Sequence, residues 1–416
     1  MSMDPATRRM PVPDWLAGGP AARLVGLIAR AGEEVRVVGG AVRNTLIGEP
    51  PGDIDMATTA LPEAVMRLAE AEGLKAVPTG IAHGTVTIVV EGRGFEVTTL
   101  RQDVETDGRH ALVRFGRDWR ADAARRDFTV NAMSLRADGA LYDYFGGADD
   151  LAAGRVRFIG DAVARIREDR LRILRFFRFQ ATVGSGAPDA EALAACIAER
   201  AGLAALSRER LRMEMLKLVI APRACETLEV MADAGLLGMV LGGVPLYRDL
   251  GRLAAIERAL GLAPDGARRL AALAVLVRED AERLRERLAL SNADYRRIEG
   301  IGHGWHALDP AHGMAAAKAV LFAAGPRGYR DRALVAFARS AAPVEDAGWQ
   351  ALATLTERWQ APSFPISGHD LAARGFADGP AIGAALARLK AAWIAADFPV
   401  SREAIDRLIS GLTTGR

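Results

Sequence analysis

Two aspartates with one residue between them, Asp53 and Asp55, follow a glycine pair and an arginine, Gly39, Gly40 and Arg43. Alternate residues of a strand project from the same face, with Cα atoms roughly 6.6 Å apart, so both carboxylates can face one point. Two such acids repel each other unless a cation lies between them, and Mg²⁺ is the usual oxygen-liganded partner. The pattern favours a site for a nucleoside triphosphate and its metal ions over the alternative, a polar turn.

The elements that must position these residues occupy the first third of the chain. Residues 35–38 read as a strand that ends at the glycine pair. Further strands are predicted at 53–57, 85–90, 94–100 and 140–145, and helices at 14–32 and 62–72, the second capped by Thr59. We therefore expect an α+β fold class with a mixed or antiparallel sheet in an N-terminal domain of residues 1–150.

Beyond residue 150 the strand signals nearly vanish, and Ala, Leu, Arg and Glu dominate. The pattern predicts an all-α remainder with no repeat period of a solenoid. Its expected helices cover 161–180, 188–200, 207–220, 222–235, 249–260, 266–287, 292–303, 312–323, 330–340, 346–358 and 380–395.

Composition narrows the class of protein. The 416 residues carry a net charge of +2, so any affinity for nucleic acid must come from local patches. Two cysteines exclude a disulfide scaffold and fit a reducing, cytoplasmic compartment. The N-terminus lacks the apolar segment of a secretory signal, and no run of apolar residues is long enough to span a membrane. The oligomeric state stays open.

A third carboxylate, Glu96, lies in the middle of the strand predicted at 94–100. A lone acid on a strand usually faces solvent. If this strand pairs beside Asp53 and Asp55, however, Glu96 joins the same metal site. Two metal ions roughly 3.5–4 Å apart could then clamp the attacking and leaving oxygens of an in-line phosphoryl displacement.

A second motif reads Arg-Arg-Asp-Phe-Thr-Val-Asn and includes Arg126, Asp127, Thr129 and Asn131. Its arginines offer bidentate contacts to phosphate or ribose. Thr129 and Asn131 can bond sugar hydroxyls or cap local backbone. The alternative is a charged turn that leads into a buried segment.

A basic helix is predicted around residues 166–179, where Asp169, Arg172, Arg175 and Arg178 recur every three residues. A plain interpretation is a solvated face with one ion pair. A more specific one uses hydrogen-bond complementarity, because a carboxylate accepts and a guanidinium donates. An Asp–Arg pair matches the edge of cytosine or adenine, whereas guanine and uracil reverse that order. This helix would then select CTP and ATP.

Helix 207–220 places Arg210, Glu214 and Lys217 on one face. We expect these side chains to form an ion network that packs this helix and braces the helical arm.

Taken together, these motifs resemble the class II tRNA nucleotidyltransferase/poly(A) polymerase family in order and spacing, over residues of about 30–220. Residues 364–371 and 79–85 resemble the CCA-adding branch. The resemblance implies a nucleotidyltransferase head (1–150), a neck that selects the base (151–225), a body (226–330) and a tail that binds tRNA (331–416). The implied activity is addition of C, C and A to the tRNA 3′ end from CTP and ATP, with release of pyrophosphate.

The resemblance also implies residue roles. Asp53 and Asp55 would hold two Mg²⁺ ions, with Glu96 as a third acid. Asp169 and Arg172 would read the base. The nucleotide's phosphates and sugar would be bound by Gly39, Gly40, Arg43, Arg126, Asp127, Asn131, Arg175 and Arg178. Residues 103–119 resemble a flexible loop that switches the site from C to A addition.

One residue departs from the family pattern. Asn44 stands where the family commonly carries Asp after the arginine. An asparagine can still orient Arg43 by hydrogen bonding but lacks the charge.

Two alternatives remain. A bacterial poly(A) polymerase shares the head motifs, but its Gly-Arg-Arg-Phe segment is replaced here by residues 79–85. A catalytically inactive RNA-binding homologue would keep the fold, and the intact Asp53 and Asp55 argue against it. A CC-adding enzyme is disfavoured because the loop before Arg125 is complete.

Overall fold

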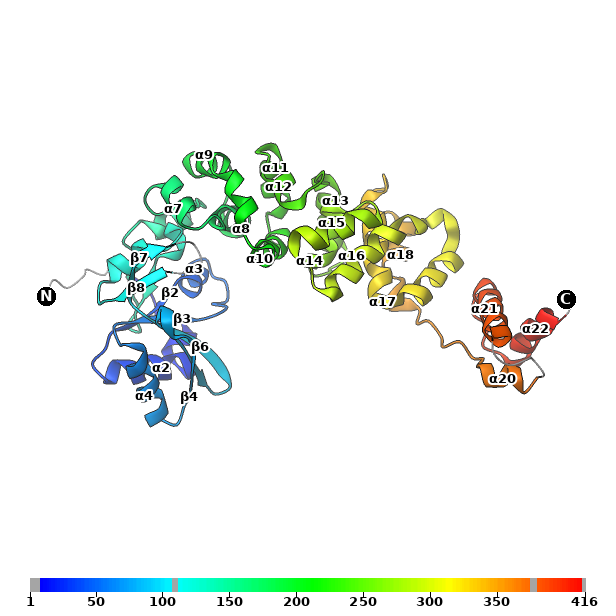
Figure 1. The fold of residues 1–416 in the computed structure, drawn as a ribbon, viewed down its shortest axis with the longest axis horizontal. Helices are drawn as coiled ribbons and strands as arrows, with labels where there is room; N and C mark the ends of the chain where they lie inside the picture. Colours follow the sequence, from blue (N-terminus) through cyan, green and yellow to red (C-terminus); the bar gives the residue numbers. More distant parts are fainter. Residues whose placement is uncertain (1–7, 107–110, 375–379, 414–416) are drawn as a thin grey trace. The chain divides into compact units, whose positions relative to one another are not determined.

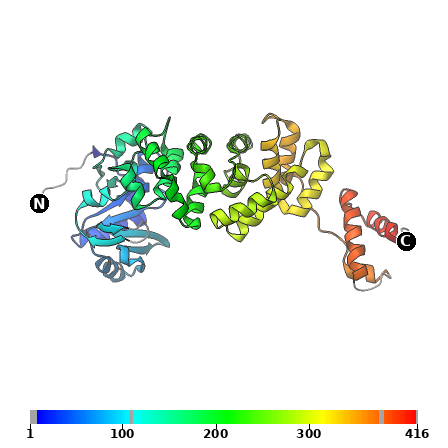
Figure 2. The ribbon, with the colours of Figure 1, turned by 45° about the horizontal axis from the view of Figure 1, so that its top comes forward.

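The computed structural model describes residues 8–106, 111–374 and 380–413. The chain divides into two compact units, Met1–Val240 and Leu241–Arg416. The first unit contains a mixed sheet followed by helices, and the second is helical (Figures 1 and 2). The head, neck, body and tail boundaries expected from the sequence remain predictions.

The head sheet has the strand order β1-β10-β9-β2-β3-β6-β5-β4. Among the strand pairs of the described residues, β3 and β6 are parallel and the others are antiparallel, so the predicted mixed sheet is confirmed. The strands are β1 (Arg8–Arg9), β2 (Val35–Val38), β3 (Asp55–Thr58), β4 (Lys75–Gly80), β5 (Thr85–Val90), β6 (Arg93–Thr99), β9 (Ser134–Leu135) and β10 (Ala140–Tyr142). A separate hairpin pairs β7 (Arg101–Thr106) with β8 (Ala111–Phe115).

Alternating apolar residues form the central strands. In β5 Val86, Ile88 and Val90 are fully buried, while Thr87 and Val89 between them are partly exposed. The turn Glu91-Gly92 has positive φ at both residues, which fits a two-residue hairpin between β5 and β6.

Helices α1 (Asp14–Ala17) and α2 (Gly19–Arg30) lie between β1 and β2 in the chain, and α4 (Pro62–Ala71) lies between β3 and β4. Helices α2 and α4 pack against the sheet (Figure 1). The helix predicted at 14–32 is interrupted by the extended backbone of Gly18. The predicted cap of α4 is wrong. Leu61 precedes that helix, and the Thr59 hydroxyl instead accepts from the Glu34 backbone N–H at 2.9 Å.

The remaining helices of the first unit begin with α3 at the glycine pair. They are α3 (Gly40–Leu46), α5 (Trp119–Ala124), α6 (Gly147–Ala152), α7 (Ala162–Glu168), α8 (Arg172–Val183), α9 (Ala190–Ala198), α10 (Arg208–Val219) and α11 (Ala224–Asp233). A further helix, α12 (Leu236–Leu241), ends at the division between the units. Short 3₁₀ turns occur at η1 (Ile81–His83), η2 (Thr129–Asn131) and η3 (Arg200–Ala205).

The single helix predicted at 161–180 is wrong. Asp169 has extended backbone angles, φ −150° and ψ 106°, which separate α7 from α8. Its carboxylate accepts from the Leu171 backbone N–H at 3.0 Å, a local bond that competes with helix continuation.

The second unit consists of helices. They are α13 (Tyr247–Ala259), α14 (Gly266–Ala274), α15 (Arg278–Leu288), α16 (Asn292–Gly304), α17 (Gly313–Arg339), α18 (Ala347–Ala353), α19 (Leu355–Arg358), α20 (Gly368–Ala372), α21 (Pro380–Ala395) and α22 (Arg402–Thr413), with 3₁₀ turns η4 (Trp305–Ala307) and η5 (Pro310–His312).

Two helix boundaries of this unit differ from expectation. The helix predicted at 266–287 ends at Ala274 and restarts at Arg278, because the Asp280 carboxylate accepts from the backbone N–H groups of Leu276 and Val277. The helices predicted at 312–323 and 330–340 form α17, which kinks at Gly325, φ 70°, before Pro326.

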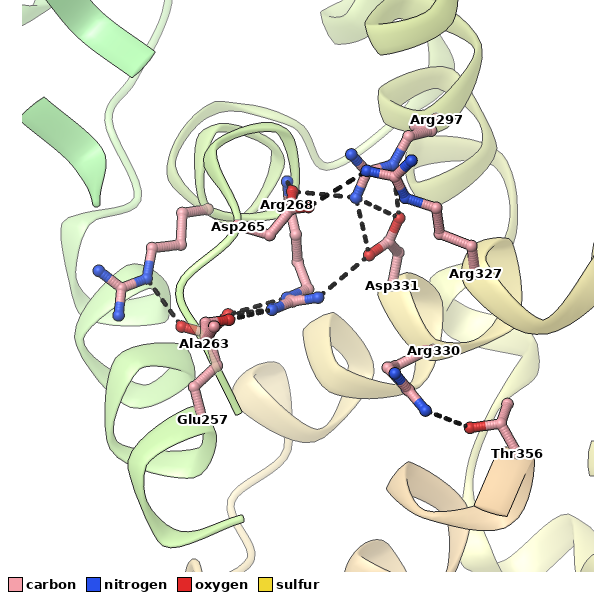
Figure 3. Close-up of polar contacts among 10 residues, drawn as sticks. Glu257, Ala263, Asp265, Arg268, Arg297, Arg327, Arg330, Asp331 and Thr356 are labelled. Carbon is pink, nitrogen blue, oxygen red and sulfur yellow. Dashed lines mark hydrogen bonds and ion pairs between the residues drawn. The ribbon is translucent and has the colours of Figure 1, made fainter. Parts of the chain in front are cut away.

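A buried ionic network joins α13, α14, α16 and α17 (Figure 3). Glu257 accepts from Arg268 at 2.8 Å and from Arg269 at 2.7 Å. Asp331, only 1% exposed, pairs with Arg268 at 3.3 Å and with Arg297 at 2.9 Å. Arg268 and Arg297 line a cavity of about 520 Å³. Their guanidinium groups are already paired with carboxylates, so we assign the network to helix packing.

Within the described residues, no helix combines the length and the apolar character that crossing a membrane requires.

Candidate active site

The two aspartates lie at the end of β3 beside the glycine pair. Asp55 is the first residue of β3 and faces Val38, the last residue of β2, in the antiparallel register. Between the aspartates, Ile54 is only 4% exposed, whereas Asp53 and Asp55 both reach solvent. The alternation therefore directs both carboxylates away from the core, and their binding of one metal site stays a prediction.

Glu96 lies next to this pair. Strands β3 and β6 are parallel with Met56 opposite Val97, so Asp55 and Glu96 are the preceding residues on neighbouring strands. Partial burial raises the pKa of Asp55 to about 6, and repulsion from Glu96 and Asp53 adds to the increase, while Arg126 opposes it.

This edge suits a divalent cation by its donors and its charge. Carboxylate oxygens are the ligands that Mg²⁺ prefers, and the charges of Glu96 and Asp53 add to burial in raising the pKa of Asp55. Within the described residues, however, no three acidic, histidine or cysteine side chains are close enough to hold one ion together. Two carboxylates completed by water and substrate phosphates are the usual arrangement for Mg²⁺.

The first glycine lets an arginine approach the chain closely. Gly39 has φ +69°, a conformation that side chains rarely adopt, and a Cβ atom there would lie 3.3 Å from Nη1 of Arg126. Arg126 also pairs with Asp122 at 3.3 Å. The charge of Arg126 also lowers the pKa of Asp55, so this arginine is near both Gly39 and the carboxylate pair. Asp122 is 3% exposed and was not predicted, although its i, i+4 spacing to Arg126 could have indicated it.

Arg43 is buried within the site at 9% exposure. It donates to the side-chain oxygen of Asn131 and, at 2.8 Å, to that of Asn44. Burial, followed by repulsion from Arg178, lowers the pKa of Arg43 to about 10. Asn44 thus orients Arg43, as expected where the family commonly carries Asp.

Asp127 and Asn131 carry this network from the head to α8. The Asn131 amide donates to the Asp127 carboxylate at 3.2 Å, and Arg175 donates to the same carboxylate at 2.6 Å. Burial alone would raise the pKa of Asp127, but Arg175 holds it below its usual range. The side chains of Asp127 and Asn131, which the sequence predicted to bind the nucleotide, are therefore hydrogen-bonded to other residues of the protein in this structure.

The two predicted base-reading residues flank the break between α7 and α8 and have separate partners. Asp169 pairs with Arg210 of α10 at 2.7 Å. Arg172 pairs with Glu168 at 2.6 Å and donates to the Arg165 carbonyl at 2.7 Å. Sequence reasoning assigned Arg210 to helix bracing, and the structure also brings it to Asp169.

Three arginines surround one aromatic ring that the sequence did not single out. The guanidinium carbons of Arg178, Arg43 and Arg175 lie 4.1, 5.1 and 5.4 Å from the ring centroid of Phe179. Phe179 is 4% exposed. Arg178 also pairs with Glu214 of α10 at 2.6 Å, so an ion pair of α10 holds this helix against α8.

Comparison with known proteins identifies the family. Residues 35–157 match the poly A polymerase head domain, and residues 187–245 match the probable RNA and SrmB-binding site of polymerase A. The Danio rerio protein named CCA tRNA nucleotidyltransferase 1, mitochondrial, is 37% identical over 395 residues, which cover 91% of this chain and 87% of the relative. A CCA-adding enzyme of Geobacillus thermodenitrificans is 44% identical over 210 residues, 50% of each chain.

A solved structure agrees over nearly the whole chain. The Bacillus stearothermophilus CCA-adding enzyme in complex with CTP has a TM-score of 0.77 and 29% identity, covering 95% of this chain and 97% of that one. As the motifs indicated, this chain belongs to the family of CCA tRNA nucleotidyltransferases, whose head domain is shared with poly(A) polymerases.

Proposed function

We propose that this enzyme adds C, C and A in turn to the 3′ end of tRNA from CTP and ATP without a template. The observation that carries the proposal is the placement of Asp53 and Asp55 beside Glu96 of the neighbouring strand, with Arg126 acting on Asp55 and lying close to Gly39. In each addition the terminal ribose hydroxyl attacks the α-phosphorus of the incoming nucleotide. One phosphodiester bond forms, and the bond to pyrophosphate breaks.

Asp53 and Asp55 would hold two Mg²⁺ ions, with Glu96 adding negative charge from the neighbouring strand. When bound, these ions supply positive charge to the phosphates and favour ionisation of the attacking hydroxyl. Binding of cations would also relieve the repulsion from Glu96 and Asp53 that adds to burial in raising the pKa of Asp55.

The residues around the glycine pair would position the triphosphate. Gly39 and Gly40 would let the backbone approach the phosphates, and Arg126, which is close to Gly39, also acts on the Asp55 carboxylate. Arg43, Asn131 and the other buried polar residues fix this geometry. Asp127 does so by pairing with Arg175. Arg175 and Arg178 add positive charge from α8.

We propose that Asp169 and Arg172 read the base edge. Their present partners, Arg210 and Glu168, keep each charge paired until a base binds. Cytosine and adenine would satisfy both groups, whereas uracil and guanine would leave them unpaired.

The remaining assignments follow the same family interpretation. We propose a head at 1–150, a neck at 151–225, a body at 226–330 and a tail at 331–416 that binds tRNA. Contact with tRNA would be made mainly to its phosphate backbone and would weaken with salt. A cytoplasmic location fits Cys196 and Cys225, which form no disulfide, although similar proteins from animals are mitochondrial by name.

The direct test offers purified protein and Mg²⁺ a tRNA that ends at the discriminator base. Each nucleoside triphosphate is supplied separately, and then CTP is supplied with ATP. We expect addition of C, C and A that then stops. Long A tails would assign the protein to the poly(A) polymerase branch, and no incorporation would leave an inactive RNA-binding homologue.

Base selection has its own test. The double variant Asp169→Ala with Arg172→Ala is expected to lose the preference for CTP and ATP over UTP and GTP, as measured by single-turnover incorporation. An unchanged preference would show that other residues read the base.

A further inference from the structure

We propose that Asn44 is a positioning residue that ties the loop before Asp53 to α3, through a hydrogen bond that an aspartate could not donate. The inference concerns how the chain holds its carboxylate pair, and only its activity readout rests on the proposed function.

The orientation of the Asn44 amide follows from its two partners. Nη2 of Arg43 donates to Oδ1 of Asn44 at 2.8 Å, and because a guanidinium only donates, the amide oxygen must face it. The amide nitrogen then points the other way and donates to the Pro50 carbonyl at 3.1 Å. A flipped amide would satisfy neither partner.

The loop that receives this bond leads directly to Asp53. The Asn44 backbone carbonyl accepts from the Glu49 N–H at 2.9 Å, so Asn44 binds the loop through both backbone and side chain. On the far side, Nη2 of Arg93 donates to the Gly52 carbonyl at 3.0 Å. Asp53 precedes the first paired residue of β3, so these ties are what fix the backbone before it.

An aspartate at position 44 would change one of these interactions and keep the other. Its carboxylate would accept from Arg43 and add a charge pair. It has no N–H group for Pro50, however, and would set a carboxylate oxygen against a carbonyl oxygen. An aspartate at position 44, the residue common in the family, is therefore expected to loosen the loop of residues 49–53 in this chain.

The decisive variant is Asn44→Asp, measured first without metal or substrate. Pro50 and Pro51 have no backbone N–H, so hydrogen exchange followed by mass spectrometry reports on the amides of Glu49, Gly52 and Asp53. Exchange there is expected to speed up by about fivefold, the effect of losing one ordinary hydrogen bond. In CCA addition, the Mg²⁺ concentration for half-maximal rate should rise by a similar factor. The KM for CTP should stay within about twofold, because Arg43 keeps a partner.

Two further variants separate the causes. Asn44→Ala removes both bonds, so it should speed exchange at 49–53 and also raise the KM for CTP. Asn292→Asp makes the same chemical change at an exposed position in the second unit and should leave both readouts at wild-type values.

Wild-type exchange at 49–53 in Asn44→Asp, or a lower Mg²⁺ requirement, would overturn the proposal and leave Asn44 as a partner of Arg43 alone. Because exchange is measured without substrate, it decides the matter even if the wild-type protein fails to add CCA. That second result would refute the proposed function separately.

Discussion

At the scale of single residues, Asp55 carries its charge at a cost to stability. Its pKa of about 6 in the folded chain exceeds the ordinary value of 3.8, so the folded state binds the proton more readily than the unfolded state. Stability therefore falls as pH rises from about 4 to 6 and stays lowered above that. Asp55→Asn is expected to raise the melting temperature of the metal-free protein at pH 7.5, with a smaller gain at pH 5.

Asp138→Asn serves as the control, and it should change the melting temperature in the opposite direction. The Asp138 carboxylate forms a hydrogen-bonded ion pair with Arg136, which holds the pKa of Asp138 below its usual range, so Asp138→Asn should lower the melting temperature slightly at pH 7.5. Added Mg²⁺ should stabilise the wild type and fail to stabilise Asp55→Asn. A lower melting temperature in metal-free Asp55→Asn would contradict this account of the site.

A second residue-scale prediction concerns Phe179. Three guanidinium groups lie around its ring, and an aliphatic side chain would keep the burial but remove the attraction of the ring face. Phe179→Leu is expected to raise the KM for CTP about fivefold to tenfold, because the arginines would no longer be held in one arrangement. Phe179→Tyr, which keeps the ring, should restore most of the affinity.

Phe177 offers the matched control for this prediction. It is fully buried and packs edge-to-face on Phe176, with no cation over its ring among the described residues. Phe177→Leu should destabilise the chain to a similar degree yet leave the KM for CTP unchanged. Equal KM effects in both variants would reduce Phe179 to a packing residue.

At the scale of elements, one ion pair fastens the segment before η2 to α8. Asp127 is 7% exposed and bonds Arg175 at 2.6 Å, so Asp127→Asn would leave this partly buried cation with only the more distant Glu214, at 4.0 Å, as a charge partner. We expect a loss of about 3 kcal/mol in the free energy of unfolding, measured with urea. Arg175→Met added to this variant should cost much less than it does alone.

The pH dependence of this pair follows from the lowered pKa of Asp127. A depressed folded-state pKa stabilises the fold above the unfolded value of about 3.9 and loses the benefit as pH falls through the folded value. The stability difference between wild type and Asp127→Asn should thus be constant from pH 8 to about 5 and shrink only below about 4. A difference that declines near neutral pH would exclude this assignment.

The elements also mark how far sequence reasoning reaches. The boundaries of strands with apolar alternation, such as β5 and β6, were predicted to within a residue. Burial of one face of a strand requires apolar residues at alternate positions, and this pattern is visible in the sequence itself. Strand β4 was missed because Pro78 argues against a strand, and β4 tolerates it as the last strand of the sheet.

The candidate site likewise contains residues that the local sequence predicts and residues that it does not. The carboxylates and the glycine pair follow from spacing, since neighbouring residues of one chain define them. Asp169 interrupts the predicted helix, and its partner Arg210 lies on another helix, so no local pattern reveals the pair. Phe179 was missed for a related reason, because an aromatic residue in an amphipathic helix normally indicates core packing alone.

At the scale of the whole molecule, the division into two compact units predicts two thermal transitions. CTP with Mg²⁺ should raise the transition of the first unit, which identifies it. Asp331→Asn weakens the pairs with Arg268 and Arg297 inside the second unit, where Glu257 and Asp265 still pair with these arginines, and is expected to move the transition of that unit. Calorimetry should show only the second transition shifted.

The exposed pair between Lys318 and Asp397 supplies the control within the same unit. Asp397→Asn makes the same substitution where water screens the charges, so its transition should move by less than about 1 kcal/mol. Asp127→Asn should lower the first transition and leave the second in place. If Asp331→Asn lowered both transitions together, the units would be unfolding as one cooperative body. In that case, a substitution that destabilises the second unit would also lower the stability of the first unit, which contains Asp53 and Asp55.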